Sequence, residues 1–358
     1  MSERRIKNAF GLFKKSNIDV LLVTEINHVR YLSGFTGSNG IVILAPPRSY
    51  FLTDFRYTVQ AHKEVKNCQI IIASRQLITE LPQSPAFSHS KGVRVGVEAD
   101  FVSLSLLEKL KELLPSAKFI STTQLIESLS IVKDNDEISR VKKAVKIADR
   151  AFSEILNQLK PGIKEKDVAL EIEYKMKSLG AENPSFDTIV ASGQRSSMPH
   201  GRASDKRLRK GDFVTLDFGC LYRGYASDIT RTVVLGKATE KQKKVYNTVL
   251  SAQKAACKAV KPGMACSRLD GVARDMIMKA GYGDYFGHGL GHGLGMLVHD
   301  RPVLSPQSND ILEPGMIVTI EPGVYIPNWG GVRIEDDVLV TSAGGQILTR
   351  SPKELLEL

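Results

Sequence analysis

The sequence predicts an α+β protein with two domains, an α/β domain over residues 1–125 and a larger domain over residues 126–358 built from a duplicated α-α-β unit. Three observations support this fold class. The chain has 358 residues, which is long for a single domain. Its first third alternates short β-branched runs with helical segments, and the rest of the chain repeats a Pro-Gly landmark at a constant spacing.

The N-terminal domain is predicted from local patterns. We expect strands at Val20–Val23, Gly40–Leu44 and Ile70–Ile72, which are rich in β-branched residues, and a helix at Ser103–Leu114. The segment Tyr31–Gly40 is expected to be a loop, because Gly, Ser and Asn favour turns.

A long helix is predicted to open the second domain, after a boundary near Ile126–Lys133. Asp134 can cap its first turn, and Glu137 lies at the capping-box position three residues later. Apolar residues then recur at alternating steps of three and four, which gives the helix one apolar face: Ile138, Val141, Val145, Ala148, Phe152, Ile155 and Leu159. Pro161-Gly162 ends the pattern.

The second domain contains an internal repeat. Gly162 and Gly263, each preceded by Lys-Pro, are 101 residues apart, and so are Gly180 and Gly281, which end the helical segments that follow. Each half then reads as a strand followed by a further pair of strands. We therefore expect two copies of one α-α-β unit.

The first copy carries two aspartates on a predicted hairpin. Asp217 and Asp228 lie on strands joined through a short turn, and if the turn is centred between Tyr222 and Arg223 the two carboxylates face each other. Their Cβ atoms would then be about 5 Å apart, and like charges at that distance need a positive group between them.

The second copy has the same feature. Glu321 and Glu335 end two predicted strands and are symmetric about Asn328, so they could also face each other. One acidic residue in a strand is most often solvated, but two opposed pairs in two repeats call for a shared function.

A glycine-rich segment lies between the two acidic pairs. Glycine occupies every second position from Gly287 to Gly295, so an extended strand would place the glycines on one face and His288 and His292 on the other. The glycine face admits close approach of another backbone or a ligand. The spacing does not fit G-x-G-x-x-G, which argues against a dinucleotide site.

Four carboxylates and an imidazole suit two divalent ions, with Mn²⁺ first and Co²⁺ or Zn²⁺ as alternatives. Bridging carboxylates would hold such ions about 3.5–4 Å apart and acidify a shared water. This chemistry predicts a hydrolase.

The residues resemble a known family at this point. Five motifs are similar to those of the M24 "pita-bread" metallopeptidases, in particular aminopeptidase P (Xaa-Pro aminopeptidase) and prolidase (Xaa-Pro dipeptidase): Leu216-Asp-Phe-Gly219, Ser227-Asp-Ile-Thr-Arg-Thr232, His288-Gly-Leu-Gly-His-Gly293, Ile320-Glu-Pro-Gly323 and Arg333-Ile-Glu-Asp-Asp337. Tyr31–Gly40 and Thr53–Tyr57 resemble the creatinase-like N-terminal domain of that branch. The resemblance covers nearly the whole chain.

The resemblance implies a set of metal ligands. These are Asp217, Asp228, His292, Glu321 and Glu335. Asp217 would be bidentate on one ion, Asp228 and Glu335 would bridge, and His292 and Glu321 would complete the other ion.

The resemblance also implies catalytic and substrate-binding residues. The catalytic residues would be His200, His288, His299 and Glu321, with Glu321 as the proton shuttle, and the substrate-binding residues would be His288, Tyr325 and Arg333. The implied reaction is attack of a metal-bridging hydroxide on the bond before a proline at the second position.

Several functions fit these residues. The first expectation is an Xaa-Pro aminopeptidase, the alternative is an Xaa-Pro dipeptidase, and a third class is a non-catalytic pita-bread binding module. Hydrolysis of a small amidine, as by creatinase, ranks lower because that branch does not keep the metal ligands. The family also implies a homodimer.

Composition sets limits on other functions. The net charge of +10 is dispersed, with a short cluster at Lys206–Lys210, so we expect a solvated basic surface and no nucleic-acid partner. No apolar run reaches the roughly 18 residues of a membrane span, and the N-terminus lacks the apolar core of a signal peptide. Sparse cysteines are expected to be reduced in a cytoplasmic protein: Cys68, Cys220, Cys257 and Cys266.

Overall fold

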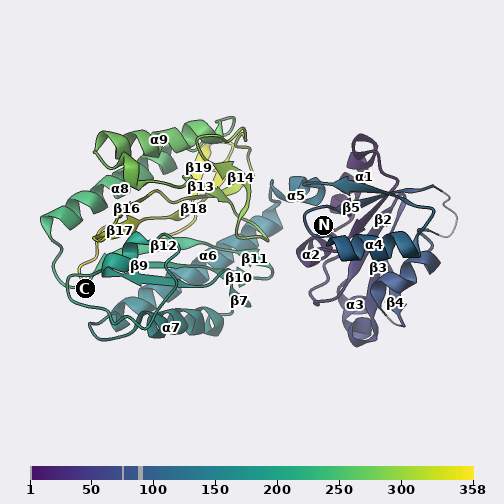
Figure 1. The fold of residues 1–358 in the computed structure, drawn as a ribbon, viewed down its shortest axis with the longest axis horizontal. Helices are drawn as coiled ribbons and strands as arrows, with labels where there is room; N and C mark the ends of the chain where they lie inside the picture. The colour runs from purple at the N-terminus through teal and green to yellow at the C-terminus, as the bar shows by residue number, and fades with distance from the viewer. Residues whose placement is uncertain (1, 75, 88–91) are drawn as a thin grey trace. The chain divides into compact units, whose positions relative to one another are not determined.

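The computed structural model describes residues 2–74, 76–87 and 92–358 (Figure 1). The chain divides into two compact units, Met1–Ser130 and Ile131–Leu358. Each unit is described by itself.

The N-terminal unit is built on one mixed six-stranded sheet with strand order β4-β3-β2-β1-β5-β6. The strands are β1 Val20–Val23, β2 Ile41–Ala45, β3 Arg48–Asp54, β4 Gln69–Ala73, β5 Arg94–Glu98 and β6 Lys118–Thr122. The helices are α1 Ser2–Ser16, α2 Ile26–Ser33, α3 Thr58–Glu64, α4 Leu104–Leu113 and α5 Leu125–Ser130, with 3₁₀ turns η1 Phe55–Tyr57 and η2 Leu77–Gln83. The central strand β1 is buried along its whole length, which explains its uninterrupted apolar sequence.

Local patterns predicted most of this unit. The strand at Val20–Val23, the strands near Gly40–Leu44 and Ile70–Ile72, and the helix capped by Ser103 are all confirmed. The loop prediction is wrong at its start, because Tyr31–Ser33 form the last turn of α2. Leu32 and its helical neighbour Val29 are fully buried, and this packing outweighs the turn-forming composition.

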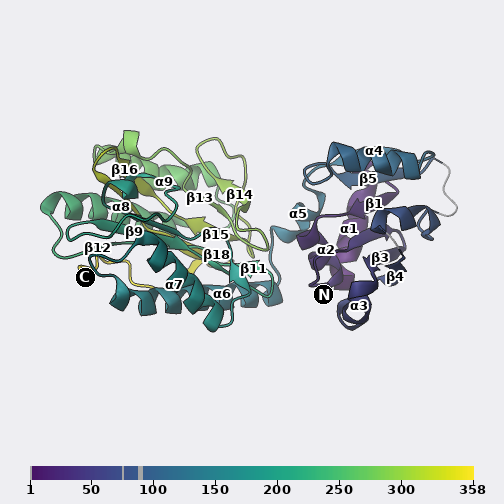
Figure 2. The ribbon, with the colours of Figure 1, turned by 60° about the horizontal axis from the view of Figure 1, so that its bottom comes forward.

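The C-terminal unit places its sheets between two helix pairs. The pair α6 (Asn135–Ile155) and α7 (Glu165–Ser178) lies on one side of the strands, and the pair α8 (Glu240–Ala259) and α9 (Cys266–Lys279) lies on the other side (Figures 1 and 2). Single 3₁₀ turns are η3 Leu156–Gln158, η4 Gly193–Ser197 and η5 Gly283–Tyr285.

Four antiparallel sheets make up the middle layer. One has the order β12-β9-β8: Ile229–Val234, Phe213–Phe218 and Ile189–Ser192. A second has the order β14-β13-β15-β18-β19: Asp300–Leu304, Gly291–Gly293, Ile317–Ile320, Asp336–Thr341 and Gly344–Ile347. The smaller ones are β11-β10-β7, at Tyr225–Ala226, Cys220–Tyr222 and Asn183–Pro184, and β16-β17, at Gly323–Ile326 and Gly330–Arg333.

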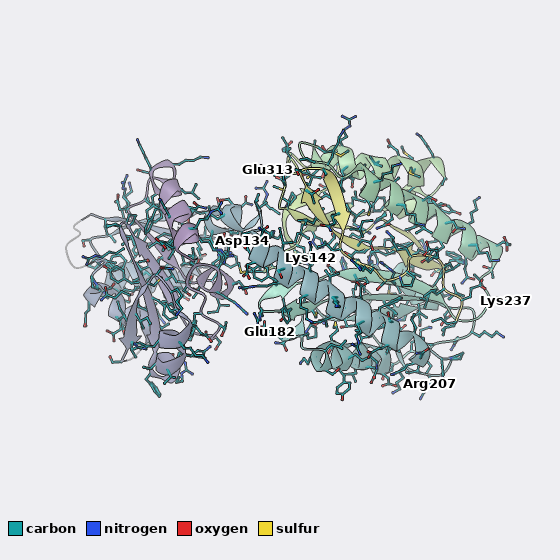
Figure 3. All side chains as sticks on the ribbon, turned by 180° about the vertical axis from the view of Figure 1, so that it is seen from behind. Asp134, Lys142, Glu182, Arg207, Lys237 and Glu313 are labelled. Atoms are coloured by element: carbon teal, nitrogen blue, oxygen red, sulfur yellow. The ribbon has the colours of Figure 1, made fainter. Side chains whose placement is uncertain are left out.

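The predicted capping box and apolar face of α6 are confirmed. Asp134 at its start accepts hydrogen bonds from the backbone of Asp136 and Glu137, and Glu137 accepts one from the backbone N–H of Asp134. The predicted apolar face is buried in the unit, with Ile138 partly exposed, and Lys142 on the opposite face is exposed (Figure 3). The apolar face of α6 thus fixes the helix against the strands that carry the site.

The duplicated unit is visible in the backbone. In each half a helix pair is followed by an antiparallel trio, β8-β9-β12 in the first half and β13-β15-β18 in the second. The linking glycines Gly162 and Gly263 both have positive φ, 97° and 77°. Equivalent β-bridges follow them, Lys164 with Arg207 and Ala265 with Ile311. The repeat brings two similar strand trios into one unit.

Two compositional expectations concern the whole chain. Over the described ranges, no helix combines the length and the apolar character that a bilayer crossing requires. All four cysteines are free thiols.

Candidate active site

A cavity of about 500 Å³ in the C-terminal unit collects the predicted site residues. Its lining includes all five predicted metal ligands together with the three predicted catalytic histidines and Arg333: Asp217, Asp228, His292, Glu321 and Glu335, then His200, His288 and His299. Tyr325 reaches the same cluster through hydrogen bonds to His288 and Arg333.

The first acidic pair is in a different register from the one predicted. Asp217 on β9 pairs with Thr230 on β12, and Asp228 lies just before β12. The predicted direct opposition of the two aspartates is therefore wrong. The turn is centred between Arg223 and Gly224, one residue later than predicted. Both residues have positive φ, as a type I′ two-residue hairpin turn requires. A shift of two positions in pairing keeps both aspartates on the same face of the sheet.

The second acidic pair has the predicted register. Ile320 pairs with Asp336 on one side of the pair, and Gly323 pairs with Arg333 on the other. Glu321 and Glu335 lie between these two partner pairs, as symmetry about Asn328 requires.

The glycine-rich segment is extended over a shorter length than predicted. Strand β13 covers only Gly291–Gly293 and has an irregular register after His292. The prediction of close backbone approach on the glycine face is confirmed. A Cβ at Gly291 would overlap the carbonyl oxygen of Thr319, and one at Gly293 would overlap that of Arg301. Only glycine allows β13 to pack between its neighbours and present His292 to the cavity.

Two carboxylate oxygens at the centre of the site are buried without a hydrogen-bond partner in the described parts of the chain. Asp228 Oδ1 and Glu335 Oε1 have no hydrogen-bond partner within the described ranges. Burial and the neighbouring carboxylates raise the pKa of both Asp228 and Glu335 well above the usual range. Burying carboxylates in this way is costly unless a cation or a proton joins them.

His292 presents a free lone pair to these carboxylates. Its Nδ1 is 3.0 Å from the carbonyl oxygen of Gly293, so Nδ1–H donates and Nε2 is left as an acceptor. Nε2 lies 3.3 Å from Glu321 Oε1 and 3.8 Å from Asp228 Oδ2. Burial lowers the pKa of His292, which favours the neutral ring. The acceptor Nε2 thus faces carboxylate oxygens, which are also acceptors. One potential ligand atom from each of Asp228, His292 and Glu335 lies within 4.8 Å of the other two.

This donor set fits divalent ions. Carboxylate oxygens and a neutral imidazole are ligands for Mn²⁺, Co²⁺ and Zn²⁺. The hydrogen bond from His292 to a backbone carbonyl is the arrangement that fixes a ligating histidine in the correct tautomer. A cation here would satisfy both orphaned carboxylate oxygens.

A chain of hydrogen bonds connects His288 to Asp217. Arg333 donates to Asp217 Oδ2 and to the Tyr325 hydroxyl, at 2.7 Å for the latter. Because Tyr325 accepts from Arg333, its own O–H can donate to His288 Nε2, 2.9 Å away. Burial lowers the pKa of His288, in agreement with a neutral ring that accepts at Nε2 and donates from Nδ1 to the Gly289 carbonyl. His288 therefore orients the Tyr325–Arg333 pair.

His200 and His299 are the two site histidines open to a substrate. Both are exposed, and neither ring forms a hydrogen bond with any part of the chain that the structure describes. The ring of His299 lies 4.5 Å from that of His292, centroid to centroid. Partial desolvation and the proximity of His292 lower the pKa of His299, which leaves it neutral near pH 7.

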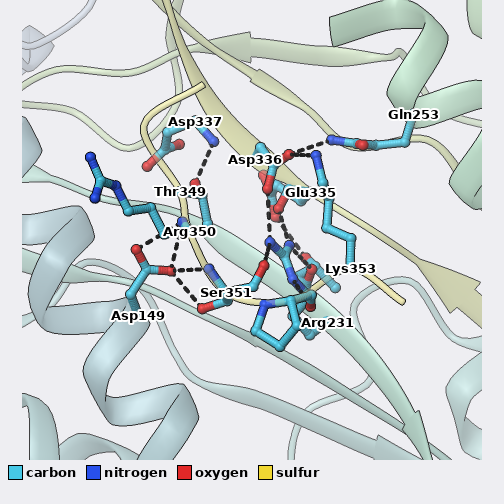
Figure 4. A network of polar contacts seen from close by, with 12 residues as sticks. Asp149, Arg231, Gln253, Glu335, Asp336, Asp337, Thr349, Arg350, Ser351 and Lys353 are labelled. Atoms are coloured by element: carbon cyan, nitrogen blue, oxygen red, sulfur yellow. Dashed lines mark hydrogen bonds and ion pairs between the residues drawn. The ribbon is translucent and has the colours of Figure 1, made fainter. Parts of the chain in front are cut away.

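Sequence reasoning missed a buried network behind the metal ligands (Figure 4). Arg231 on β12 is fully buried and donates to Asp336 Oδ1 and to the Ser351 carbonyl, both at 2.8 Å. It also donates to the backbone carbonyls of Thr230 and of the predicted metal ligand Glu335. Asp336 Oδ2 is bound by Lys353 at 2.5 Å and by Gln253 at 2.8 Å. A single charged residue, Arg231, within the otherwise uncharged strand Ile229–Val234 is the sequence signal that could have revealed it.

Two further residues hold the carboxylates in place. Thr230 donates to Glu335 Oε2 at 2.6 Å and accepts from Arg333 Nε at 3.1 Å. Asp337 accepts the backbone N–H of Asp228 at 3.1 Å. Both belong to the motifs that carry the ligands, but their roles depend on contacts between strands far apart in the sequence.

Comparison with known proteins agrees with the motifs. Residues 139–342 match metallopeptidase family M24, and residues 5–132 match the creatinase/prolidase N-terminal domain. An Xaa-Pro dipeptidase of Pyrococcus furiosus is 40% identical over 99% of this chain and 100% of its own length. The structure of an Xaa-Pro dipeptidase from Bacillus anthracis has a TM-score of 0.97 and 44% identity over 100% of both chains. An X-Pro aminopeptidase from Thermotoga maritima has a TM-score of 0.90 and 38% identity over 96% of this chain and 98% of its own.

These matches cover both units, and the cavity contains the five metal ligands that the motifs indicated. The chain therefore belongs to metallopeptidase family M24 and carries the creatinase/prolidase N-terminal domain.

Proposed function

We propose that the protein is an Xaa-Pro dipeptidase that hydrolyses the bond before proline with the help of two divalent metal ions. The observation that carries this proposal is the pair of buried, unpartnered oxygens on Asp228 and Glu335, within ligand distance of His292. Burying these carboxylates is costly, and bound cations would offset that cost.

The sequence placed Xaa-Pro aminopeptidase first and the dipeptidase second, and the relatives favour the second. Full-length relatives at 40% and 44% identity are named Xaa-Pro dipeptidases. The similarity to the Thermotoga maritima X-Pro aminopeptidase keeps that activity as the second candidate.

Five residues would hold the ions. Asp217 would serve one ion, Asp228 and Glu335 would be shared, and His292 and Glu321 would serve the other. When bound, two such ions supply Lewis acidity and lower the pKa of coordinated water. Mn²⁺ is our first choice, with Co²⁺ or Zn²⁺ as alternatives.

Glu321 is the residue we propose for proton transfer. Its burial raises the pKa of its carboxyl group, which suits a group that takes a proton from the attacking water and passes it to the leaving proline nitrogen. Thr319 donates to Glu321 Oε1 at 3.2 Å and helps to hold the carboxylate.

The histidines divide into two roles. Neutral His299, with His200 beside the same cavity, can donate a hydrogen bond to the carbonyl oxygen as it gains negative charge. His288 acts through Tyr325 and Arg333, which hold Asp217 in place.

Two expectations about the cellular protein complete the proposal. The family resemblance supports a homodimer, which light scattering on the purified protein would check. The free cysteines fit the reducing cytoplasm.

The direct test compares an Xaa-Pro dipeptide with the matching Xaa-Pro-Yaa tripeptide, using chelator-stripped protein with and without added Mn²⁺, Co²⁺ or Zn²⁺. Metal-dependent cleavage of the dipeptide alone supports the dipeptidase. Release of the first residue from the tripeptide supports the aminopeptidase, and no cleavage of either with any metal supports a non-catalytic binding module.

A further inference from the structure

The cavity contains two arginines, and they differ in availability. A dipeptidase needs a cation that binds the free carboxylate of the substrate's proline. Arg333 and Arg202 both line the cavity, but Arg333 is 4% exposed, whereas the side chain of Arg202 is 83% exposed.

Arg333 has little capacity left for a substrate. Its guanidinium donates to Asp217 Oδ2, Tyr325 Oη, Thr230 Oγ1 and the carbonyl of Pro199, which uses four of the five N–H donors of an arginine. Turning it toward a ligand would remove the partner of Asp217. Arg333 is therefore a positioning residue for a metal ligand.

Arg202 combines an anchored backbone with a solvent-exposed side chain. Its carbonyl accepts a hydrogen bond from Arg195 at 2.6 Å, and Arg195 is paired with the fully buried Glu165 at 3.0 Å. Within the described parts of the chain its guanidinium contacts only Asp187, at 3.1 Å, and the Asp187 side chain is 76% exposed. Ion pairs between two solvated groups contribute little, so this pair can open for a ligand carboxylate.

The position of the Arg202–Asp187 pair fits the length of a dipeptide. Ile189 lies directly opposite Asp217 in the β8–β9 pairing, and Asp187 is two residues earlier, which corresponds to roughly 7 Å of extended chain. The carboxylate carbon of proline lies about one residue length, about 3.8 Å, from the carbonyl that is attacked. The flexible arginine side chain can cover the difference.

The wall beside this pair is apolar. Phe186, Ile189 and Val303 line the same cavity and offer a surface for the proline ring. A carboxylate at one end of an apolar ring matches an arginine at the edge of an apolar wall, because a guanidinium binds a carboxylate through two parallel hydrogen bonds.

From these contacts we infer that Arg202 binds the C-terminal carboxylate of the Xaa-Pro dipeptide and selects dipeptides over longer or amidated substrates. This inference rests on the proposed dipeptidase activity. Asp187 pairs with Arg202 and competes with the substrate carboxylate for it.

The test compares Ala-Pro with its C-terminal amide, which differs only in the missing carboxylate charge. In the Mn²⁺-loaded enzyme, Arg202→Ala should raise KM for Ala-Pro roughly 10- to 100-fold, the range for losing hydrogen bonds to a charged group. KM for the amide should stay within about twofold, as for most surface substitutions. Arg202→Lys should recover part of the loss, since it restores charge without the two-pronged geometry.

The matched control is Arg209→Ala. Arg209 is an exposed arginine on the same segment whose side chain has no interaction within the described parts of the chain. Arg209→Ala should change KM for neither Ala-Pro nor its amide. Asp187→Asn should lower KM for Ala-Pro alone, because it removes the competing carboxylate.

The inference is overturned if Arg202→Ala leaves KM for Ala-Pro unchanged, or raises it equally for both substrates. Wild-type enzyme that cleaves no dipeptide contradicts the proposed dipeptidase activity instead. In that case calorimetric titration with Ala-Pro still decides the role of Arg202: binding at least tenfold weaker in Arg202→Ala than in the wild type supports it, and equal binding overturns it.

Discussion

Two buried glutamates, one in each unit, differ in whether their carboxylate oxygens have hydrogen-bond partners. Glu98 in the N-terminal unit is 6% exposed, and both its oxygens have partners: His28 Nδ1 at 2.6 Å, the backbone N–H of Thr24 at 2.7 Å and that of Glu25 at 3.0 Å. Glu335 in the C-terminal unit is 1% exposed, yet one of its oxygens has no partner within the described ranges and other carboxylates surround it.

This difference distinguishes a buried carboxylate with a structural role from one with a functional role. Burying a carboxylate is costly in both places, and the N-terminal unit offsets the cost with its own donors. Asp336, the residue after Glu335, shows that the C-terminal unit can do the same, because Arg231, Lys353 and Gln253 bind its two oxygens. The unpartnered oxygens of Asp228 and Glu335 belong to residues that line the cavity, so their missing partner is expected to be a bound cation.

The largest expected effect comes from removing one of these cavity carboxylates. Asp228→Ala should abolish binding of the metal pair and lower kcat/KM by on the order of a thousandfold or more, since the metals supply most of the electrostatic stabilisation. Metal content and turnover of the loaded enzyme measure the effect. Full activity with two ions still bound would rule out Asp228 as a ligand.

Breaking the satisfied network behind the site should act on stability instead. Arg231→Met leaves Asp336 with one cation fewer in a buried setting and should lower the free energy of unfolding by about 3–5 kcal/mol. Urea denaturation of the metal-free protein measures the loss. Arg231→Lys should lose less, and a loss below about 1 kcal/mol for Arg231→Met would show that the network is dispensable.

A matched pair of substitutions compares the two glutamates directly. Glu98→Gln should lower the free energy of unfolding of the metal-free protein by about 1–3 kcal/mol, because hydrogen bonds to a charged acceptor are lost. Glu335→Gln should cost nothing or be stabilising, because it removes repulsion and keeps an acceptor for Thr230. The opposite ranking in urea denaturation would contradict the distinction drawn between the two sites.

The smallest effect is a pH dependence confined to the N-terminal unit. Burial opposes protonation of His28, but the hydrogen bond and charge of Glu98, helped by Glu127 and Glu25, outweigh burial and raise the pKa of His28. The ion pair therefore contributes fully below the unfolded pKa of about 6.5, and its contribution is lost as pH rises through the raised folded value. Hydrogen exchange of β1, corrected for intrinsic rates, should show less protection at pH 9 than at pH 6. His28→Gln should remove this difference, and a difference that persists would assign it to other groups.

Local signals in the sequence predicted much of the fold and the residues of the candidate site. The capping box at Asp134, the strand at Val20–Val23 and the alternating glycines each depend on neighbours a few residues away. The repeat spacing then related the two acidic pairs. Each of these patterns is written in contiguous residues, so a single sequence contains it.

Contacts between distant segments could not be predicted in the same way. The register of the first hairpin depends on Arg223 adopting positive φ, which a non-glycine residue does only in a suitable turn. The partners of Arg231 lie 105 and 120 residues away, at Asp336 and Ser351. The saturation of the Arg333 hydrogen-bond donors likewise depends on side-chain geometry that no pattern encodes.

The most direct measurement is the metal stoichiometry of chelator-stripped protein after equilibration with Mn²⁺, for the wild type and Glu335→Gln. Two ions per wild-type chain, fewer in the variant, and a higher unfolding midpoint of the wild type alone are the predicted results. A wild-type protein that binds no divalent ion, with the same midpoint before and after equilibration, would contradict the assignment of the unpartnered carboxylates to a metal centre.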